Sequence, residues 1–320
     1  MADRSSTAAV APAELVEYRK PSLARELFRH RYLLLLMLPG IAYFVVFRYV
    51  PIYGVILAFK EYDVYEGILF SPWVGLKHFR RLFEQHDVAR VFWNTVEISV
   101  LRIVFGFPMP IILALLLNEI FNTKFKRTVQ TISYLPHFLS WVVVAGLITE
   151  LLSPSRGIYG YLMRLIGADT TVLLTSQTWF IPILIISGIW KEVGWGTIIY
   201  LATMSSINPE LYEAAVVDGA SRWRRAISIT LPGILPVTAI LLILSMSQIL
   251  NAGFDQIFNL YNTLVYEIAD IIDTYIYRVG LQSFEFEFAT AVGLTKNVIA
   301  LVLVLTVDRV VRRFTGYGLW

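Results

Sequence analysis

Long apolar runs constrain this 320-residue chain more than any other feature of its sequence. A helix needs about 20 predominantly apolar residues to cross a hydrocarbon layer ~30 Å thick. Hydrophobic residues make up 57% of the chain, above the roughly 45–50% of soluble domains. A further apolar stretch at 264–277 is too short and too acidic to cross. The sequence predicts an all-α membrane protein with six spans, at 32–59, 94–117, 129–152, 178–201, 231–250 and 288–307.

The positive residues predict how these spans are oriented, because cytoplasmic loops carry an excess of Lys and Arg. With the N-terminus inside, fifteen Lys and Arg fall in cytoplasmic segments, eight in outer loops and four in spans. Both termini are therefore expected in the cytoplasm. The expected organisation is a cytoplasmic N-terminal tail at 1–31, a six-span domain at 32–313 with a cytoplasmic loop at 202–230, and a cytoplasmic C-terminal tail at 314–320.

The N-terminal tail carries Arg and Lys but no early apolar core with a cleavage site, so we do not expect a signal peptide. Its first 20 residues, rich in Ala, Ser and Pro, are expected to be disordered.

Several kinds of site are not expected in this chain. It has no cysteine, which excludes thiol catalysis and disulfides. Its four histidines have no metal-ligand spacing, so no metal site is expected. The phosphate-binding pattern Gly-x-x-x-x-Gly-Lys-Ser/Thr does not occur, so the chain should not itself bind ATP. A net charge of +3 gives no reason to expect a nucleic-acid partner.

The loop at 202–230 has the pattern of a short helix, a turn and a second helix. Asn208 suits an N-cap and Pro209 suits the first helical position. Gly219 suits the left-handed residue that ends a helix, and Ser221 can cap the next one. The sequence therefore predicts a helix at about 209–217.

A longer pattern runs through the same loop: Glu-Ala-Ala, three residues, Gly, nine residues, then Ile-x-Leu-Pro. A glycine and small residues alone would fit an ordinary surface loop. Every position of the full pattern is nevertheless present, at Glu213, Ala214, Ala215, Gly219, Ile229, Leu231 and Pro232. The complete pattern, before the penultimate span, resembles the signature of permease subunits of bacterial binding-protein-dependent ABC importers.

This resemblance implies a type I ABC importer permease fold in the bacterial cytoplasmic (inner) membrane. It also implies three partners: a second homologous permease, two copies of a cytoplasmic ABC ATPase, and an extracellular solute-binding protein. The ATPase would bind ATP and Mg, and this chain would need no cofactor and would not be an enzyme. The helix at 209–217 would be the coupling helix, inserted into a groove of the ATPase. The residues implied in ATPase coupling are Glu213, Ala214, Ala215, Asp218, Gly219, Arg222, Ile229, Leu231 and Pro232.

Other segments narrow the resemblance to sugar-type permeases. These are 75–79 (Gly-Leu-Lys-His-Phe) with 92–95, 189–195 (Ile-Trp-Lys-Glu-Val-Gly-Trp) and 254–258 (Phe-Asp-Gln-Ile-Phe). The likeness is to oligosaccharide permeases of the alginate and polygalacturonate type. It implies a sugar or oligosaccharide, neutral or anionic, as substrate.

Polar and aromatic residues within or beside the spans are the candidates for the substrate pathway, because charges in a membrane are costly and usually functional. Sugars are often held by aromatic stacking and hydrogen bonds. For the two tryptophans, packing is the favoured alternative; for Lys191 and Glu192, ion pairing within the bundle is an equal one. The pathway candidates are Trp141, Trp190, Lys191, Glu192, Asn251, Phe254, Lys296 and Asn297.

Further charges allow two more hypotheses. Glu97 and Arg102 lie five residues apart, about 140° round a helix, so each needs another partner. For both residues, ion pairing between helices or between subunits is favoured over substrate contact. Arg102, Lys191 and Lys296 together would make a cationic interior that suits an anionic oligosaccharide such as a uronate. The acidic residues of the outer loop are expected to be a solvated surface, the alternative being a platform for the binding protein; they are Asp255, Glu267, Asp270, Asp273, Glu285 and Glu287.

Other functions remain as alternatives. In an ion-gradient-driven secondary transporter, Glu97, Lys191 and Glu192 would form the ion relay, but such transporters often show inverted repeats and more spans. A membrane enzyme would need a nucleophile, an acid–base pair or a metal group gathered in one place, and no such group stands out. A purely structural membrane protein would not need the complete loop pattern.

Overall fold

The computed structural model describes residues 28–316, and its regular secondary structure there is helical apart from one isolated bridge between Lys60 and Trp73. The expected disorder of residues 1–20 and the end of the C-terminal tail lie outside the described residues. The chain forms two compact units, which meet in sequence between Tyr53 and Gly54.

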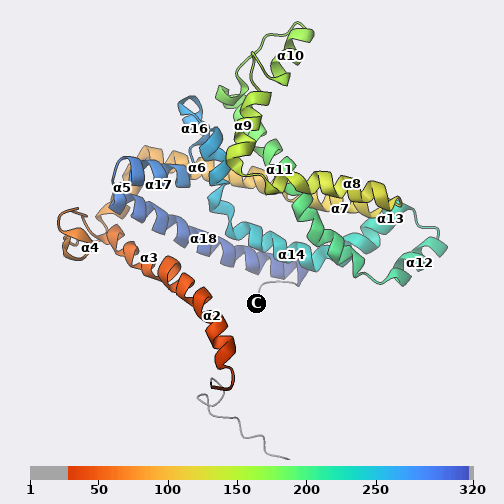
Figure 1. Ribbon diagram of the computed structural model, residues 1–320, viewed down its shortest axis with the longest axis horizontal. Helices are drawn as coiled ribbons and strands as arrows, with labels where there is room; N and C mark the ends of the chain where they lie inside the picture. The colour runs from red at the N-terminus through yellow and green to blue at the C-terminus, as the bar shows by residue number, and fades with distance from the viewer. Residues whose placement is uncertain (1–27, 317–320) are drawn as a thin grey trace, which may run out of the picture. The chain divides into compact units, whose positions relative to one another are not determined.

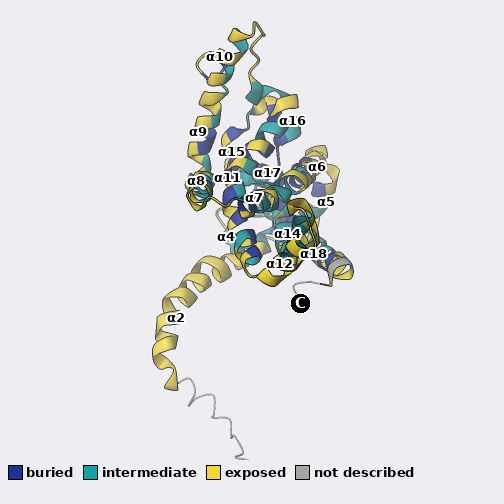
Figure 2. Ribbon diagram, turned by 90° about the vertical axis from the view of Figure 1, so that its right-hand side faces the viewer, coloured by how far each residue is buried: buried dark blue, intermediate teal, exposed yellow. Residues whose placement is uncertain are grey.

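The N-terminal unit is an apolar helix with no buried residue among those described. It comprises α2 (Arg31–Phe44), a π-helical turn η1 (Val45–Tyr49) and α3 (Val50–Ile52), and runs into η2 (Tyr53–Phe59). Its side chains are exposed on all sides (Figure 2). A helix that is hydrophobic all round is stable only where lipid or another chain covers it.

Five helices of the described part are long and apolar enough to cross a membrane: Arg31–Phe59, His86–Asn118, Gln177–Ser205, Arg222–Met246 and Phe286–Arg313. A sixth candidate is a bent pair, Thr123–Phe138 and Trp141–Leu151, with 104° between its two parts. The expected span at 129–152 falls on this bent pair. Leu139 has extended backbone, and the Ser140 side chain caps the second helix by accepting a hydrogen bond from Val143 N.

The fifth span also begins earlier than expected, at Arg222 rather than at residue 231. Ser221 caps α13 (Arg222–Arg225), which continues through the π-helical turn η6 (Ala226–Thr230) into α14 (Leu231–Ser247). The second helix of the loop and the span are therefore one helix.

Proline explains where several of these helices change their winding. The π-helical turns η1, η3 (Arg102–Gly106) and η6 each end two residues before a proline, namely Pro51, Pro108 and Pro232. Proline cannot donate the hydrogen bond to the carbonyl four residues earlier, and its ring crowds that carbonyl. A wider turn just before it relieves the crowding.

The C-terminal unit contains the remaining helices (Figure 1). Those that precede residue 176 are α4 (Gly67–Phe70), α5 (Lys77–Glu84), α6 (His86–Leu101), α7 (Pro108–Asn118), α8 (Thr123–Tyr134), η4 (Leu135–Phe138), α9 (Trp141–Leu151), α10 (Ile158–Leu165) and η5 (Leu173–Thr175). Those that follow it are α11 (Gln177–Ser205), α12 (Pro209–Val217), η7 (Ile249–Asn251), α15 (Phe254–Leu260), η8 (Thr263–Val265), α16 (Tyr266–Ala269), α17 (Ile272–Tyr277), η9 (Arg278–Gln282) and α18 (Phe286–Thr315).

Helix α11 is central to the packing, because it contacts α7, α8 and α14, while α14 lies along α18 (Figure 1). One core cluster joins α6, α9 and α11 to the short helices after α14, around the fully buried Phe180, Leu184 and Ile257. Another joins α7, α11 and α14 around Ala114 and Ile234. Burial at these contacts holds the bent pair and the short helices against the long spans.

The acidic outer loop is not simply a solvated surface, so that expectation was wrong for part of it. Asp270 is fully buried and accepts from the Arg278 guanidinium at 3.1 and 2.5 Å and from Thr274 Oγ1 at 2.8 Å. Burial lowers the pKa of Arg278, but the hydrogen bond and charge of Asp270, together with Tyr266 and Tyr261, leave that pKa above its ordinary value. The loop is therefore a folded part of the bundle, fastened by a buried ion pair.

Candidate functional site

The loop pattern folds as the sequence predicts. Helix α12 runs over Pro209–Val217, and the Asn208 side chain accepts a hydrogen bond from Glu210 N at 3.0 Å. At its other end Gly219 has φ +74°, Gly219 N donates to Val216 O, and Ala220 N donates to Ala215 O. These two bonds and the left-handed glycine form a Schellman end, which satisfies the last carbonyls of the helix.

Helix α12 carries exposed apolar side chains. Val217 is 88% exposed, Val216 56% and Leu211 53%. A hollow of about 310 Å³ beside it is lined by Tyr212, Glu213, Val216 and Arg225. Exposed apolar groups beside a hollow are a surface suited to contact with another protein.

Two side-chain contacts fasten this loop to the bundle. The hydroxyls of Tyr212 and Thr230 lie 2.9 Å apart, which joins α12 to η6. Arg222 lies 3.8 Å from Glu119 and stacks over the Phe121 ring at 4.9 Å, which joins α13 to the turn after α7. A displacement of α12 would therefore be passed to the helix α13–η6–α14, and through Arg222 to the turn after α7. The sequence did not predict a structural role for Tyr212 or Glu119. Their partners lie far away in the sequence, and the loop pattern gives no information about them.

The coupling candidates occupy one continuous stretch of structure. Three lie on α12, two at its end, one on α13, one in η6 and two at the start of α14; in that order they are Glu213, Ala214, Ala215, Asp218, Gly219, Arg222, Ile229, Leu231 and Pro232.

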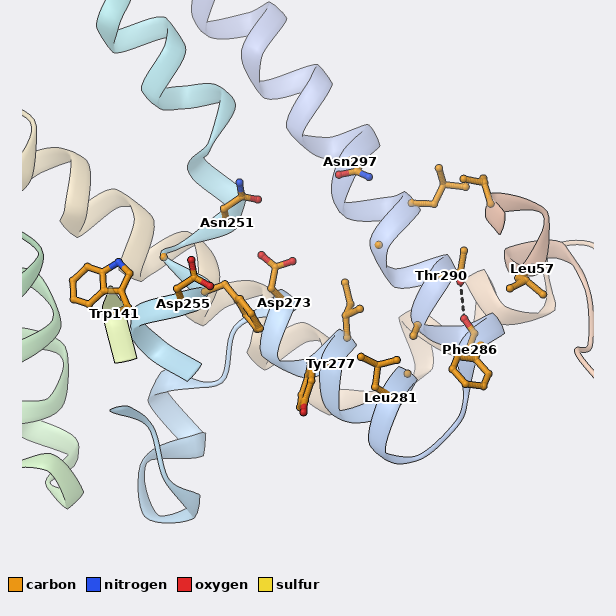
Figure 3. A pocket seen from close by; sticks show the side chains of 18 residues that line it. Leu57, Trp141, Asn251, Asp255, Asp273, Tyr277, Leu281, Phe286, Thr290 and Asn297 are labelled. Carbon is orange, nitrogen blue, oxygen red and sulfur yellow. Dashed lines mark hydrogen bonds between the residues drawn. The ribbon is translucent and has the colours of Figure 1, made fainter. Parts of the chain in front are cut away.

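A cavity of about 930 Å³ lies in the C-terminal unit, between α9, the segment 251–255, α17 and α18. Figure 3 shows Trp141, Asn251, Asp255 and Asp273 at one end of it. Among the pathway candidates Trp141, Asn251, Phe254 and Asn297 line this cavity. Lining residues that were not pathway candidates include Asp255, Asp273, Tyr277, Phe286 and Thr290.

Lys296 lies behind the wall of this cavity, where its charge is countered. Its ammonium donates to Asp273 at 2.6 and 2.7 Å and to Asn251 Oδ1 at 2.8 Å. Asp273 comes from the outer loop and α17, far from Lys296 in sequence. The pair therefore holds α17 and η7 against α18 and fixes two lining side chains.

Lys191 is also countered. Its ammonium donates to the His137 carbonyl at 2.8 Å and lies 3.3 Å from Glu192, whose other oxygen is 2.8 Å from His137 Nδ1. The His137 ring stacks on Trp195 with 4.5 Å between centroids. This group joins α11 to the bend of the α8–α9 pair. Neither Lys191 nor Trp190 lines the large cavity.

A second cavity, of about 180 Å³, is lined by Arg102, Trp141 and Glu192 together with residues of α7 and α11. Trp141 lines both cavities. Arg102 donates to Gln256 Oε1, and no carboxylate lies within 4 Å of it in residues 28–316. Its Nε atom is buried without a hydrogen-bond partner. Within the same range no three His, Asp or Glu side chains are grouped as metal ligands would be.

We expect Lys296→Met to destabilise the protein by roughly 3 kcal/mol, because it strands a largely buried Asp273 carboxylate. The double variant Lys296→Met/Asp273→Leu should recover most of that loss, since both charges are then gone. Thermal unfolding in detergent measures both. As a control, Lys77→Met breaks the exposed Lys77–Glu61 pair and should leave Tm unchanged. Equal Tm values for Lys296→Met and the double variant would contradict the argument.

Comparison with known proteins decides the family. The family described as "Binding-protein-dependent transport system inner membrane component" matches residues 106–316. The chain belongs to this family. It is 42% identical to the polygalacturonan/rhamnogalacturonan transport system permease protein YteP of Bacillus subtilis, over 98% of each chain.

Two solved structures are similar as well. A bacterial ABC transporter involved in the import of the acidic polysaccharide alginate has a chain that is 45% identical, with a TM-score of 0.85 over 92% of this chain and 99% of that one. A bacterial alginate ABC transporter, in complex with a periplasmic protein that holds an alginate pentasaccharide, has a 45% identical chain with a TM-score of 0.86 over 93% and 100%.

The family membership answers the main question of function. The chain is a multi-pass inner-membrane permease subunit of a binding-protein-dependent sugar ABC importer. It is a transport subunit, and a secondary transporter is no longer the competing interpretation. The six-span, all-α prediction and the family resemblance are confirmed, with one of the spans bent.

Proposed function

We propose that this permease forms half of an oligosaccharide pathway together with a second permease subunit. Two copies of an ABC ATPase would bind ATP and Mg on the cytoplasmic side, where both chain termini also lie. A solute-binding protein would deliver the substrate from outside. The large cavity would be this chain's share of the pathway, because it brings aromatic and polar side chains together as sugar binding requires.

We propose further that α12 is the coupling helix. The observation that supports this most is a short, well-capped helix with exposed apolar side chains. Tyr212 joins it to the helix α13–η6–α14, which Arg222 in turn joins to the turn after α7. A partner that bound the exposed residues of α12 and moved with its own nucleotide cycle would shift the equilibrium between two states of the bundle.

The substrate class that we propose is an acidic oligosaccharide. The support is the identity of 42–45% to permeases of polygalacturonan/rhamnogalacturonan and alginate transport systems. Both kinds of polymer carry carboxylates on their sugar rings, so the pathway would handle a chain of uronates.

The test uses the four-component complex in membrane vesicles, with a radiolabelled polyuronate trisaccharide outside and ATP inside. Uptake should require ATP and survive an ionophore that collapses the membrane potential. Val217→Asp should lower both copurification of the ATPase and uptake at least tenfold, because it places a charge on the most exposed apolar side chain of α12 in the proposed contact.

The matched control is Val64→Asp, which changes another exposed valine, 73% exposed, in the loop after the first span. It should leave copurification and uptake at the wild-type level. Val217→Asp with normal ATPase binding would refute the docking role of α12. Uptake that stops with the ionophore, or that ignores ATP, would refute the proposed energy source.

A further inference from the structure

The hypothesis of a cationic interior rested on three residues, Arg102, Lys191 and Lys296. In the structure these three residues differ in the partners of their charges. Lys191 is countered by Glu192, and Lys296 by Asp273. Arg102 differs from both, since in the described part of the chain its guanidinium bonds to an amide and has no carboxylate within 4 Å, although Glu192 lines the same small cavity beyond that distance. A guanidinium inside a membrane span normally pairs with an anion, because leaving it unpaired is costly.

The position of Arg102 indicates from which side an anion could approach its guanidinium. Its guanidinium lies directly against Gly253, where a Cβ would overlap it. Gly253 lines the large cavity. On its other side the guanidinium lines the small cavity beside Gly188. The two cavities are therefore neighbours, separated at this point by Arg102 and by a residue that has no side chain.

The small cavity has the size and lining of a side pocket. Its volume of about 180 Å³ would hold roughly six waters at ~30 Å³ each, which is room for a hydrated carboxylate and part of a sugar ring. Trp141 offers an aromatic surface to both cavities. Glu192 also lines the pocket, but Lys191 at 3.3 Å and His137 at 2.8 Å already hold it, so it opposes an incoming anion less.

We propose that Arg102 is the residue by which this permease recognises a carboxylate on its substrate. The carboxylate of a uronate ring in the large cavity would reach the guanidinium past Gly253 and enter the small cavity, with the ring beside Trp141. A guanidinium suits this task because its fixed fork of donors matches the two carboxylate oxygens. This inference rests on the proposed function and adds to it the group that the pathway selects.

The test compares two substrates that differ only in the recognised group: a polyuronate trisaccharide and the same trisaccharide with its carboxyls reduced to hydroxymethyl groups. Uptake of each is measured in vesicles with the complete transporter and one binding protein. For Arg102→Gln, uptake of the acidic substrate should fall at least tenfold, and uptake of the reduced one should change less than threefold. Arg102→Lys, which keeps the charge but not the fork, should lie between wild type and Arg102→Gln.

Because all variants share one binding protein, its own preference cancels when the acid-to-reduced ratio is compared between variants. Lys77→Gln is the matched control; it removes a positive charge that Glu61 already counters, it lines neither cavity, and it should leave both rates unchanged. If Arg102→Gln lowers both rates equally, or neither, Arg102 is a packing residue that orients Gln256 and the inference is wrong. If the wild type imports neither substrate, the proposed substrate class fails, and the carboxylate pocket fails with it.

Discussion

Replacing Gly219 with proline is expected to abolish ATP-driven uptake, with a fall of at least a hundredfold. Gly219 has φ +74°, whereas proline holds φ near −65°. Gly219 N also donates to Val216 O, a bond that proline cannot make. The hydrogen bonds that end α12 would be lost, and the helix would no longer be held in one orientation toward the proposed ATPase contact. Uptake in vesicles and ATPase copurification, measured together, show whether coupling or docking is lost.

The matched control for this prediction is Gly219→Asn at the same position. Asparagine is among the few residues that adopt the left-handed conformation at small cost, and it keeps the backbone N–H. An added Cβ at Gly219 would meet no atom within 4 Å, so space is not the constraint. Gly219→Asn should keep most of the wild-type uptake. Equal loss in both variants would mean that the backbone conformation of Gly219 is not what matters.

Local signals in the sequence were sufficient to predict α12. Its cap at Asn208, its first residue Pro209 and its end at Gly219 are each determined by side chains and backbone within a few positions. Such capping signals depend on neighbouring residues alone, so they predict helix ends without knowledge of the rest of the fold. The same holds for the length and apolar character of the long spans, which depend on the membrane and not on a particular neighbour.

Features that depend on distant partners could not be predicted in this way. The bend after Phe138 is a break in hydrogen bonding within an apolar run, and hydropathy does not register it. Asp270 and Asp273 were expected in solvent because their loop is acidic, yet Arg278 and Lys296 counter them. The small cavity needs Arg102, Trp141 and Glu192 from three helices at once. The periodicity of residues along one helix carries no information on contacts between side chains of different helices.

Gly194 is the position where the packing of the bundle should be least tolerant of change. A Cβ there would overlap the backbone carbonyl of Ser133, because α11 and α8 approach each other closely at this point. Small residues allow such approaches and are a main source of helix association in membranes. We expect Gly194→Leu to cost more than ~3 kcal/mol, since backbone cannot move aside as a flexible side chain can. The yield of folded, monodisperse protein from membranes should fall at least tenfold.

Gly146 on α9 provides the comparison, because a Cβ at that position would meet no atom within 4 Å. Gly146→Leu should fold normally. The corresponding alanine variants should differ in sign: Gly146→Ala should raise stability by up to ~1 kcal/mol through helix propensity, while Gly194→Ala should lower Tm despite the same gain. Chromatographic profiles and thermal unfolding in detergent measure all four. A Gly194→Ala variant as stable as Gly146→Ala would mean that α8 and α11 can separate without cost, and the bend of the α8–α9 pair would then need another support.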